Sequence, residues 1–172
     1  KQIGPTLGQE GVKKGVYASI IALIAITLFM IIYYKVSGLF TTFTIISCLA
    51  LLFALMSLIN TTLTLPGVIG IVLTIGMCVD ANVLIFERIR ENFKNNSENP
   101  KSEGFNAAYV TILDSNLTTL FAAIFLFAFG FGPIRGFSIS LIIGILSSLI
   151  VTYIVLKLFI NAIPERLLGL KK

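Results

Sequence analysis

The chain contains no histidine and no tryptophan, and only two cysteines, Cys48 and Cys78, occur among its 172 residues. The absence of histidine excludes His-based catalysis and metal sites built from cysteine and histidine. Both cysteines stand inside apolar segments, so we expect no disulfide framework of the kind found in small secreted domains. The sequence accordingly predicts neither a bound metal nor a cofactor.

Charge is also scarce, since charged residues make up 12% of the chain whereas hydrophobic residues make up 56%, with a mean hydropathy of +0.98. That balance is typical of polytopic membrane proteins and excludes the soluble globular class. The net charge is +5, but the basic residues stand between the apolar runs. This pattern indicates contact with lipid headgroups and control of membrane topology rather than binding of nucleic acid.

Most of the sequence consists of five long apolar runs. About 20 helical residues cross the roughly 30 Å hydrocarbon core of a bilayer, so each run predicts a membrane-spanning helix. The fourth run reaches that length only if its helix extends back through residues 111–116. The predicted fold is an all-α membrane protein, a bundle of five transmembrane helices within residues 15–165. The five runs are residues 16–34, 40–59, 65–86, 117–131 and 137–163.

The only long polar segment, residues 87–116, is expected to form a cytoplasmic loop. Apolar residues recur within it at the spacing i, i+3, i+4, i+7 and i+8, which predicts an amphipathic helix on the membrane surface. Asp114 comes next, where we expect it to cap the fourth span, with an active role as the alternative. The residues of the predicted amphipathic helix are Phe105, Ala108, Tyr109, Ile112 and Leu113.

The distribution of basic residues predicts the orientation of the bundle. With the polar segment inside, the inner Lys and Arg residues outnumber the outer ones, as the positive-inside rule requires. We therefore expect residues 166–172 to form a cytoplasmic tail and the N-terminus to lie outside. Residues 1–14 are expected to be the tail of an external domain, with a further span upstream.

Small residues at intervals of about four predict where helices approach each other closely, because backbones in lipid associate through van der Waals contact. One such stripe lies on the fifth predicted helix and consists of Gly136, Ser140, Gly144, Ser148 and Thr152. A second lies on the second predicted helix and consists of Ser47, Ala50, Ala54 and Ser57.

Asp80 stands inside the third apolar run, where a carboxylate is unfavourable by several kcal/mol unless it faces protein or water. Such residues serve ion pathways, proton relays or polar pairing between helices. On a helix, Asp80 shares a face with Gly76, which leaves room for a partner side chain or water. Asp80 lies about 9 Å before Phe86 at the end of the run. A carboxyl that alternates between buried and hydrated surroundings can bind and release a proton.

Two asparagines, Asn82 and Asn116, are candidates to hydrogen-bond Asp80. No Lys or Arg stands deep in any apolar run, so a cationic partner would come from another chain. Glu87, Arg88 and Arg90 follow the third run and are expected to anchor its cytoplasmic end. A structural hydrogen bond between helices remains the alternative to a proton relay at Asp80.

Four stretches of the sequence resemble the SecD members of the SecD/SecF family of protein-export membrane proteins, within the RND (resistance-nodulation-division) superfamily. The longest is residues 64–91, TLPGVIGIVLTIGMCVDANVLIFERIRE, in which the DANVLIFER wording is characteristic of SecD rather than of SecF. The others are residues 3–8, residues 111–119 and residues 132–137. Together they extend over essentially the whole chain.

The resemblance implies an RND-like unit of six spans, of which this chain would supply spans two to six, without the large periplasmic domain that follows the first. It implies a bacterial cytoplasmic membrane protein that pairs with SecF, assists the SecYEG channel and uses the proton-motive force to promote late export of a translocating polypeptide. Asp80 matches the family's membrane-embedded acid in proton passage.

Two alternatives are weaker. The first is an RND-type efflux transporter for small molecules. The second is an intramembrane aspartyl protease, which would require Asp80 and Asp114 to face each other. We expect the chain not to be an enzyme.

Overall fold

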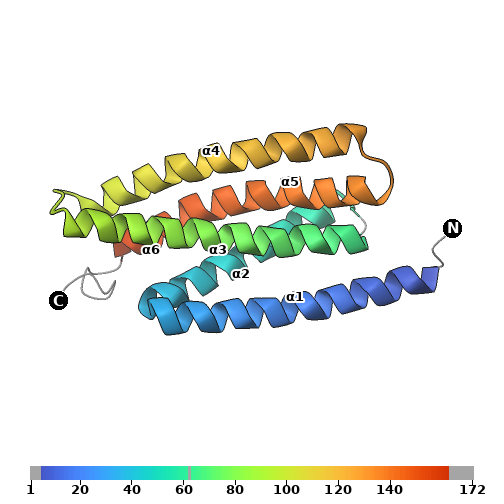
Figure 1. Ribbon diagram of the computed structural model, residues 1–172, viewed down its shortest axis with the longest axis horizontal. Coiled ribbons are helices and arrows are strands. Elements are labelled where there is room, and N and C mark those ends of the chain that lie inside the picture. Colours follow the sequence, from blue (N-terminus) through green and yellow to red (C-terminus); the bar gives the residue numbers. More distant parts are fainter. Residues whose placement is uncertain (1–4, 62, 163–172) are drawn as a thin grey trace.

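The computed structural model describes residues 5–61 and 63–162, and all regular structure within them is helical (Figure 1). The last long helix continues through a π-helical turn, η1, into a short final helix. The elements are α1 (Pro5–Tyr34), α2 (Val36–Leu58), α3 (Leu65–Lys94), α4 (Pro100–Phe129), α5 (Pro133–Val151), η1 (Thr152–Leu156) and α6 (Lys157–Ala162).

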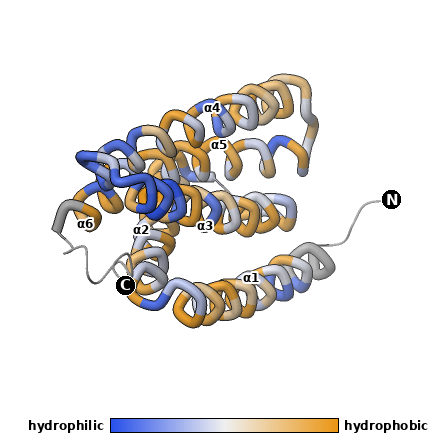
Figure 2. The backbone as a smooth tube through the Cα atoms, turned by 60° about the vertical axis from the view of Figure 1, so that its left-hand side comes forward, coloured by the Kyte–Doolittle hydropathy of each residue, from blue (hydrophilic) through white to orange (hydrophobic). Residues whose placement is uncertain are grey.

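The structure confirms the predicted all-α architecture, because five of its helical segments are long and apolar enough to cross a membrane. Consecutive helices run in opposite directions, so the connections alternate between the two ends of the bundle (Figure 1). Hydrophilic residues gather at the end that holds the α3–α4 connection, whereas the bodies of the helices are mostly hydrophobic (Figure 2). We call this the polar end and the opposite one the α2–α3 end.

Among the described residues, each of the four connections contains one residue in the left-handed region of backbone conformation. This region is most accessible to glycine and asparagine, which occupy three of the four positions. The residues are Lys35 (φ 50°), Asn60 (φ 51°), Asn96 (φ 53°) and Gly132 (φ 55°). Such single-residue reversals let long helices pack directly against their neighbours in sequence.

The third and fifth helices run parallel along a seam of small residues. An added Cβ on Gly136 would lie 2.6 Å from Thr64 Oγ1, one on Gly70 would meet the Ser140 hydroxyl, and one on Gly144 would meet Thr74. The predicted small-residue stripe on the fifth helix is therefore confirmed as a packing surface.

The prediction that the small-residue stripe on the second helix packs against another helix of this chain is wrong. Ala50, Ala54 and Ser57 are exposed, and Ser47 is only half-buried. The helix instead buries larger side chains in one cluster with residues of α3 and α5, where close packing fills the interior. The buried residues are Ile45, Cys48, Leu52 and Met56.

The predicted loop over residues 87–116 is mostly helical, because α3 continues to Lys94 and α4 begins at Pro100. The prediction of a separate amphipathic helix on the membrane surface is also wrong, because its residues form the first turns of α4. Phe105, Ala108 and Ile112 are buried in a cluster with Ile85 and Ile89 of α3, so their apolar face contacts protein rather than the membrane surface. Asp114 lies inside α4 and caps no helix.

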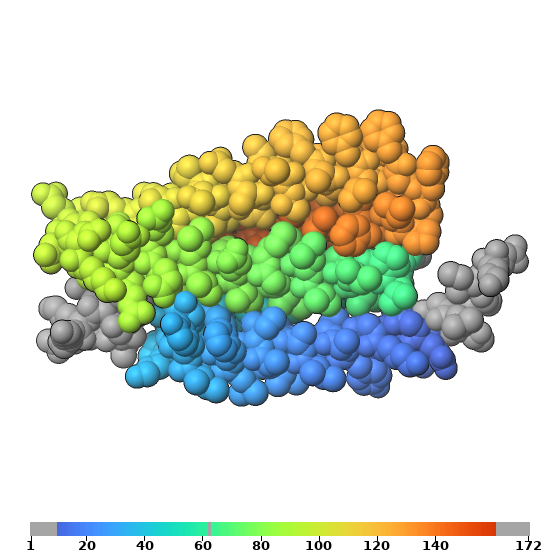
Figure 3. Space-filling view, viewed as in Figure 1, coloured from blue at the N-terminus to red at the C-terminus, as the bar shows by residue number. Residues whose placement is uncertain are grey.

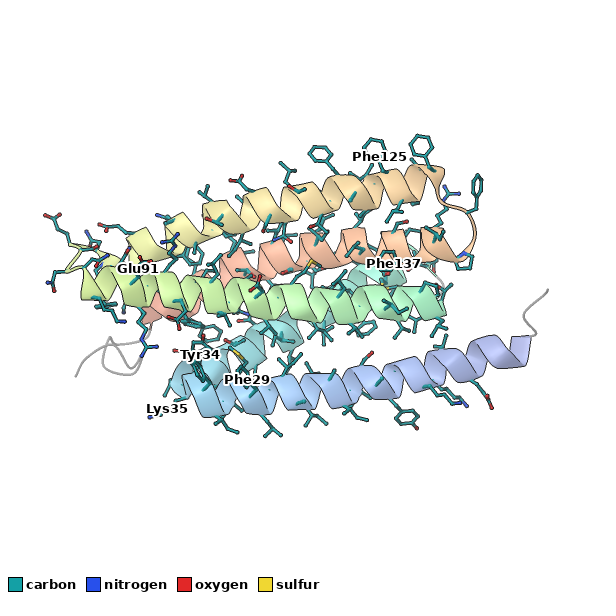
Figure 4. All side chains as sticks on the ribbon, viewed as in Figure 1. Phe29, Tyr34, Lys35, Glu91, Phe125 and Phe137 are labelled. Atoms are coloured by element: carbon teal, nitrogen blue, oxygen red, sulfur yellow. The ribbon has the colours of Figure 1, made fainter. Side chains whose placement is uncertain are left out.

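The first helix lies at the periphery of the bundle. In the space-filling view α1 forms a separate band beside α3, with most of its side chains facing outward (Figure 3). It contacts α3 at both ends, because Gly11 and Gly15 lie against Leu65 and Val68, and Tyr34 lies near Glu87 at the polar end. Figure 4 shows Tyr34 between α1 and the second half of α3.

Candidate functional site

Asp80 opens into a groove between α3 and α4 of about 210 Å³. The space-filling view shows the seam between these two helices on the front of the molecule (Figure 3). Besides the Asp80 carboxylate, an amide and two hydroxyls line the groove, among apolar side chains. The lining residues are Met77, Asp80, Ala81, Leu84, Ile112, Ser115, Asn116 and Thr119.

The two helices that form the groove present these residues through helical periodicity. On α3, Met77, Asp80 and Leu84 are separated by three and four residues, so they share a face. On α4, Ile112, Ser115 and Thr119 repeat the same spacing. Because α3 and α4 are antiparallel, their middle sections meet, and Asp80 lies midway along α3, about 22 Å from Leu65.

The polar side chains that α4 contributes are satisfied by their own helix. Asn116 Nδ2 donates to the Ile112 carbonyl oxygen at 2.8 Å, and Ser115 Oγ donates to the same oxygen at 3.1 Å. Thr119 Oγ1 donates to the Ser115 carbonyl oxygen at 3.2 Å. The hydroxyl oxygens keep lone pairs with which they can accept hydrogen bonds from water in the groove.

The Asp80 carboxylate is exposed, and no hydrogen bond or ion pair reaches it from residues 5–61 or 63–162. The described ion pairs join Arg88 to Glu91 and Arg90 to Glu87, both within α3. Asp80 is therefore open to water, to a proton or to a group supplied from outside the described chain.

The two asparagines predicted to support Asp80 occupy different sites. Asn116 is buried at 7% exposure and lines the groove. Asn82 is fully buried on another face of α3, where its Nδ2 donates to the Cys78 carbonyl oxygen at 2.9 Å, and it is not among the groove residues. Only Asn116 is thus placed to influence Asp80 through the groove.

The remaining predicted residues lie outside the groove. A Cβ added at Gly76 would meet nothing within 4 Å, so the space beside this exposed glycine is open. Asp114 is exposed on α4 and does not line the groove, so the two aspartates share no pocket. Glu87, Arg88 and Arg90 lie nearer the polar end of α3, in the pairs already described.

Sequence reasoning missed Ser115 and Thr119. Ser115 precedes the fourth apolar run and Thr119 lies within it. Serine and threonine are common in membrane helices, so neither residue stands out in the sequence. Their spacing from Ile112 and Asn116 would have placed them on one face, but only if residues 111–116 had been assigned firmly to the fourth helix.

The groove combines a single unpaired carboxylate with neutral oxygen and nitrogen groups. The groove can hold water beside Asp80, and a carboxyl group in contact with water can exchange a proton with that water. No group of three or more His, Cys, Asp or Glu side chains gathers within the described part of the chain. The groove therefore holds one exposed carboxylate beside neutral polar groups, with Asp114 outside it.

Comparison with known proteins gives consistent matches. A family model described as "Protein export membrane protein SecD/SecF, C-terminal" matches residues 1–163. The "Protein translocase subunit SecD" of Calditerrivibrio nitroreducens is 49% identical over 151 residues, which are 87% of this chain and 29% of the relative. The corresponding protein of Rickettsia prowazekii is 47% identical over 163 residues, 94% of this chain and 32% of the relative.

The fold is similar to that of a solved membrane protein. The crystal structure of SecDF from Thermus thermophilus, described as translocon-associated, matches with a TM-score of 0.89 and 37% identity, over 95% of this chain and 23% of the other. SecDF in a super-membrane-facing form matches with a TM-score of 0.82. This chain spans less than a third of the length of these relatives and of the solved chain.

Proposed function

The chain belongs to the family of SecD/SecF C-terminal membrane domains, and from this membership we propose that it forms the transmembrane part of a proton-driven auxiliary subunit of the Sec translocase. In the complete protein this part supplies the proton pathway, and the external domain contacts the exported polypeptide. The observation that carries the proposal is the unpaired Asp80 carboxylate in the groove between α3 and α4.

Asp80 acts in this proposal as the site that takes up and releases a proton. Its neutral form is favoured when the groove is closed to water, and its ionised form when water or a cationic group enters. Asn116, Ser115 and Thr119 stabilise the water through which the proton arrives. A change in how α3 and α4 pack would then follow each protonation and be transmitted to the external domain.

Replacing Asn116 or Asn82 by leucine distinguishes the role of the groove from that of the buried core. In the full-length protein, Asn116→Leu should reduce proton-driven export severalfold while the amount of folded protein stays normal, because it removes a polar groove wall. Asn82→Leu should leave the groove intact and change thermal stability, because Asn82 is enclosed between helices. Export into inverted vesicles with an imposed proton gradient and the melting temperature are the two measurements.

Equal losses of export in the two variants, at equal levels of folded protein, would contradict the special position of Asn116. Asn116→Asp provides a second test. It keeps the groove wall polar but adds a second carboxylate, which should disturb proton exchange at Asp80 and so reduce proton-driven export.

We place the bundle in the bacterial cytoplasmic membrane with its polar end in the cytoplasm. The supporting observation is that Arg88, Arg90 and Lys94 lie at the end that also holds the α3–α4 connection, as the positive-inside rule requires. The α2–α3 and α4–α5 connections would then face the periplasm.

Accessibility to a membrane-impermeant thiol reagent tests this orientation. In full-length protein lacking Cys48 and Cys78, Ser97→Cys should react only from the cytoplasmic side and Asn60→Cys only from the periplasmic side. Both positions lie in connections between helices, so labelling should not require unfolding. The reversed pattern in intact cells and inverted vesicles would refute the proposed topology.

The expected partners follow from the same family. SecF would pack beside the membrane face that contains Asp80, and any cation needed there would come from it. The SecYEG channel would bind the assembled complex. An RND-type efflux transporter is the second candidate, and a proton site in this groove would serve either activity; export of a secreted polypeptide by the complete protein distinguishes them. We propose no enzymatic activity for this part.

A further inference from the structure

Lys157, the first residue of α6, lies against aromatic rings rather than beside a carboxylate. Its Nζ donates to the Tyr153 hydroxyl at 3.2 Å. It also lies 4.7 Å from the centroid of the Tyr153 ring and 5.8 Å from that of Phe105. Neither ion pair of the described residues involves Lys157. Its positive charge is therefore held in place, and no carboxylate of residues 5–61 or 63–162 forms an ion pair with it.

The rings beside Lys157 form a continuous aromatic wall from two helices. Tyr109 of α4 lies 5.1 Å from Tyr153 of η1, measured between ring centroids. Phe105 stacks on Tyr109 with centroids 5.8 Å apart and is itself buried. Tyr153 belongs to the π-helical turn, a rare backbone form that often occurs at functional sites. The Lys157 ammonium group and the Tyr153 hydroxyl thus lie together, and the Tyr109 ring packs beside the Tyr153 ring.

The packing of α3 and α5 gives the depth of this cluster. Gly144 faces Thr74 and Ser148 faces Cys78, so the parallel helices are offset by a constant number of residues. Beyond the π-helical turn, Leu156 and Ile160 pack in one cluster with Ile85 and Ile89 of α3. Lys157 therefore lies near the level of Glu87, beyond the end of the third apolar run. Glu87 also lies near Tyr34 at the end of α1. The cluster therefore lies where the spans reach the lipid headgroups.

Apolar side chains extend outward next to the cluster. Ile154 is 52% exposed and Leu158 is 66% exposed, on the same short segment as Tyr153 and Lys157. A molecule with an anionic group above a hydrocarbon chain matches this arrangement of charge and apolar surface. Zwitterionic headgroups would gain less, because their own cation offsets the attraction to Lys157.

We propose that Phe105, Tyr109, Tyr153 and Lys157 form a binding site for the phosphate group of an anionic phospholipid in the leaflet at the polar end. Lys157 supplies the charge and the tyrosine hydroxyls donate hydrogen bonds to phosphate oxygens. Phe105 holds the Lys157 ammonium from beneath, and Ile154 and Leu158 contact the acyl chains. The site is independent of the Asp80 groove and of the orientation of the bundle in the membrane.

Native mass spectrometry of the full-length protein in detergent tests the site, with phosphatidylglycerol, phosphatidylcholine and inorganic phosphate as separate probes. Lys157→Gln should weaken binding of phosphatidylglycerol about fivefold, since one basic residue near the membrane surface contributes on the order of that much. Lys94→Gln removes the same charge at the exposed end of α3, away from the rings, and should leave binding nearly unchanged. Tyr153→Phe keeps the ring and should produce a smaller loss.

Three results would overturn the proposal. Equal weakening by Lys157→Gln and Lys94→Gln would indicate a diffuse effect of charge. Equal affinity for phosphatidylcholine would remove the preference for an anionic headgroup. Inorganic phosphate that displaces phosphatidylglycerol at equal concentration would show a site for the free anion instead. The melting temperature of each variant identifies misfolding, and Lys157→Arg, which retains the charge, should retain lipid binding if the site is intact.

Discussion

Replacing Asp80 by asparagine in the full-length protein should reduce export to the level observed without a proton gradient, while folding and assembly stay normal. Asparagine keeps the shape of the side chain and most of its hydrogen-bonding capacity, but it cannot exchange a proton. The groove contains no second carboxylate that could replace Asp80, because Asp114 faces elsewhere on α4. Export should be measured under a defined proton gradient, together with the amount of assembled complex.

Asp80→Glu provides the matched control for this experiment. It keeps a titratable carboxyl and moves it by one methylene within an open groove, so part of the activity should remain. A purely structural Asp80 predicts the opposite order. In that case the neutral asparagine would be tolerated, because it avoids burying an unpaired charge, and glutamate would be the worse substitution. Normal export by Asp80→Asn would exclude the proton-relay role.

Gly144→Ala should lower the stability of the bundle by about 1–3 kcal/mol, the usual effect of overpacking a well-packed interface. The new Cβ would lie 2.9 Å from both Cβ and Cγ2 of Thr74 and closer still to its hydroxyl. Thr74 is fully buried and donates to the Gly70 carbonyl oxygen at 2.9 Å, so its rotation would break a hydrogen bond. The melting temperature of the purified full-length protein measures the effect.

Gly76→Ala is the control because it makes the same chemical change on α3, two residues after Thr74, at an exposed position that faces away from the contact with Gly144. Nothing lies within 4 Å of the position where its Cβ would be, and alanine favours helix over glycine. Its melting temperature should be unchanged or slightly raised. A loss of stability as large as that of Gly144→Ala would mean that the α3–α5 seam is not the source of the effect.

The sequence by itself determined the number of apolar helices that are long enough to cross a membrane, and it placed Asp80 within the third of them. The length of an apolar run indicates whether a helix can cross a bilayer, and helical periodicity predicts which side chains of one helix share a face. It also identified the small-residue stripe on the fifth helix correctly. It failed over residues 87–116, because a polar helix extending from the membrane has the same composition as a loop.

Only the tertiary structure decided which neighbour each helical face meets. Asn82 and Asn116 are the same type of residue, and both stand near Asp80 or at the start of an apolar run, yet one is enclosed in the core and the other lines the groove. The two small-residue stripes likewise have similar spacing, and only one is buried. Periodicity within a helix is a local property, whereas the pairing of helix faces depends on contacts between segments distant in sequence, which no single helix encodes.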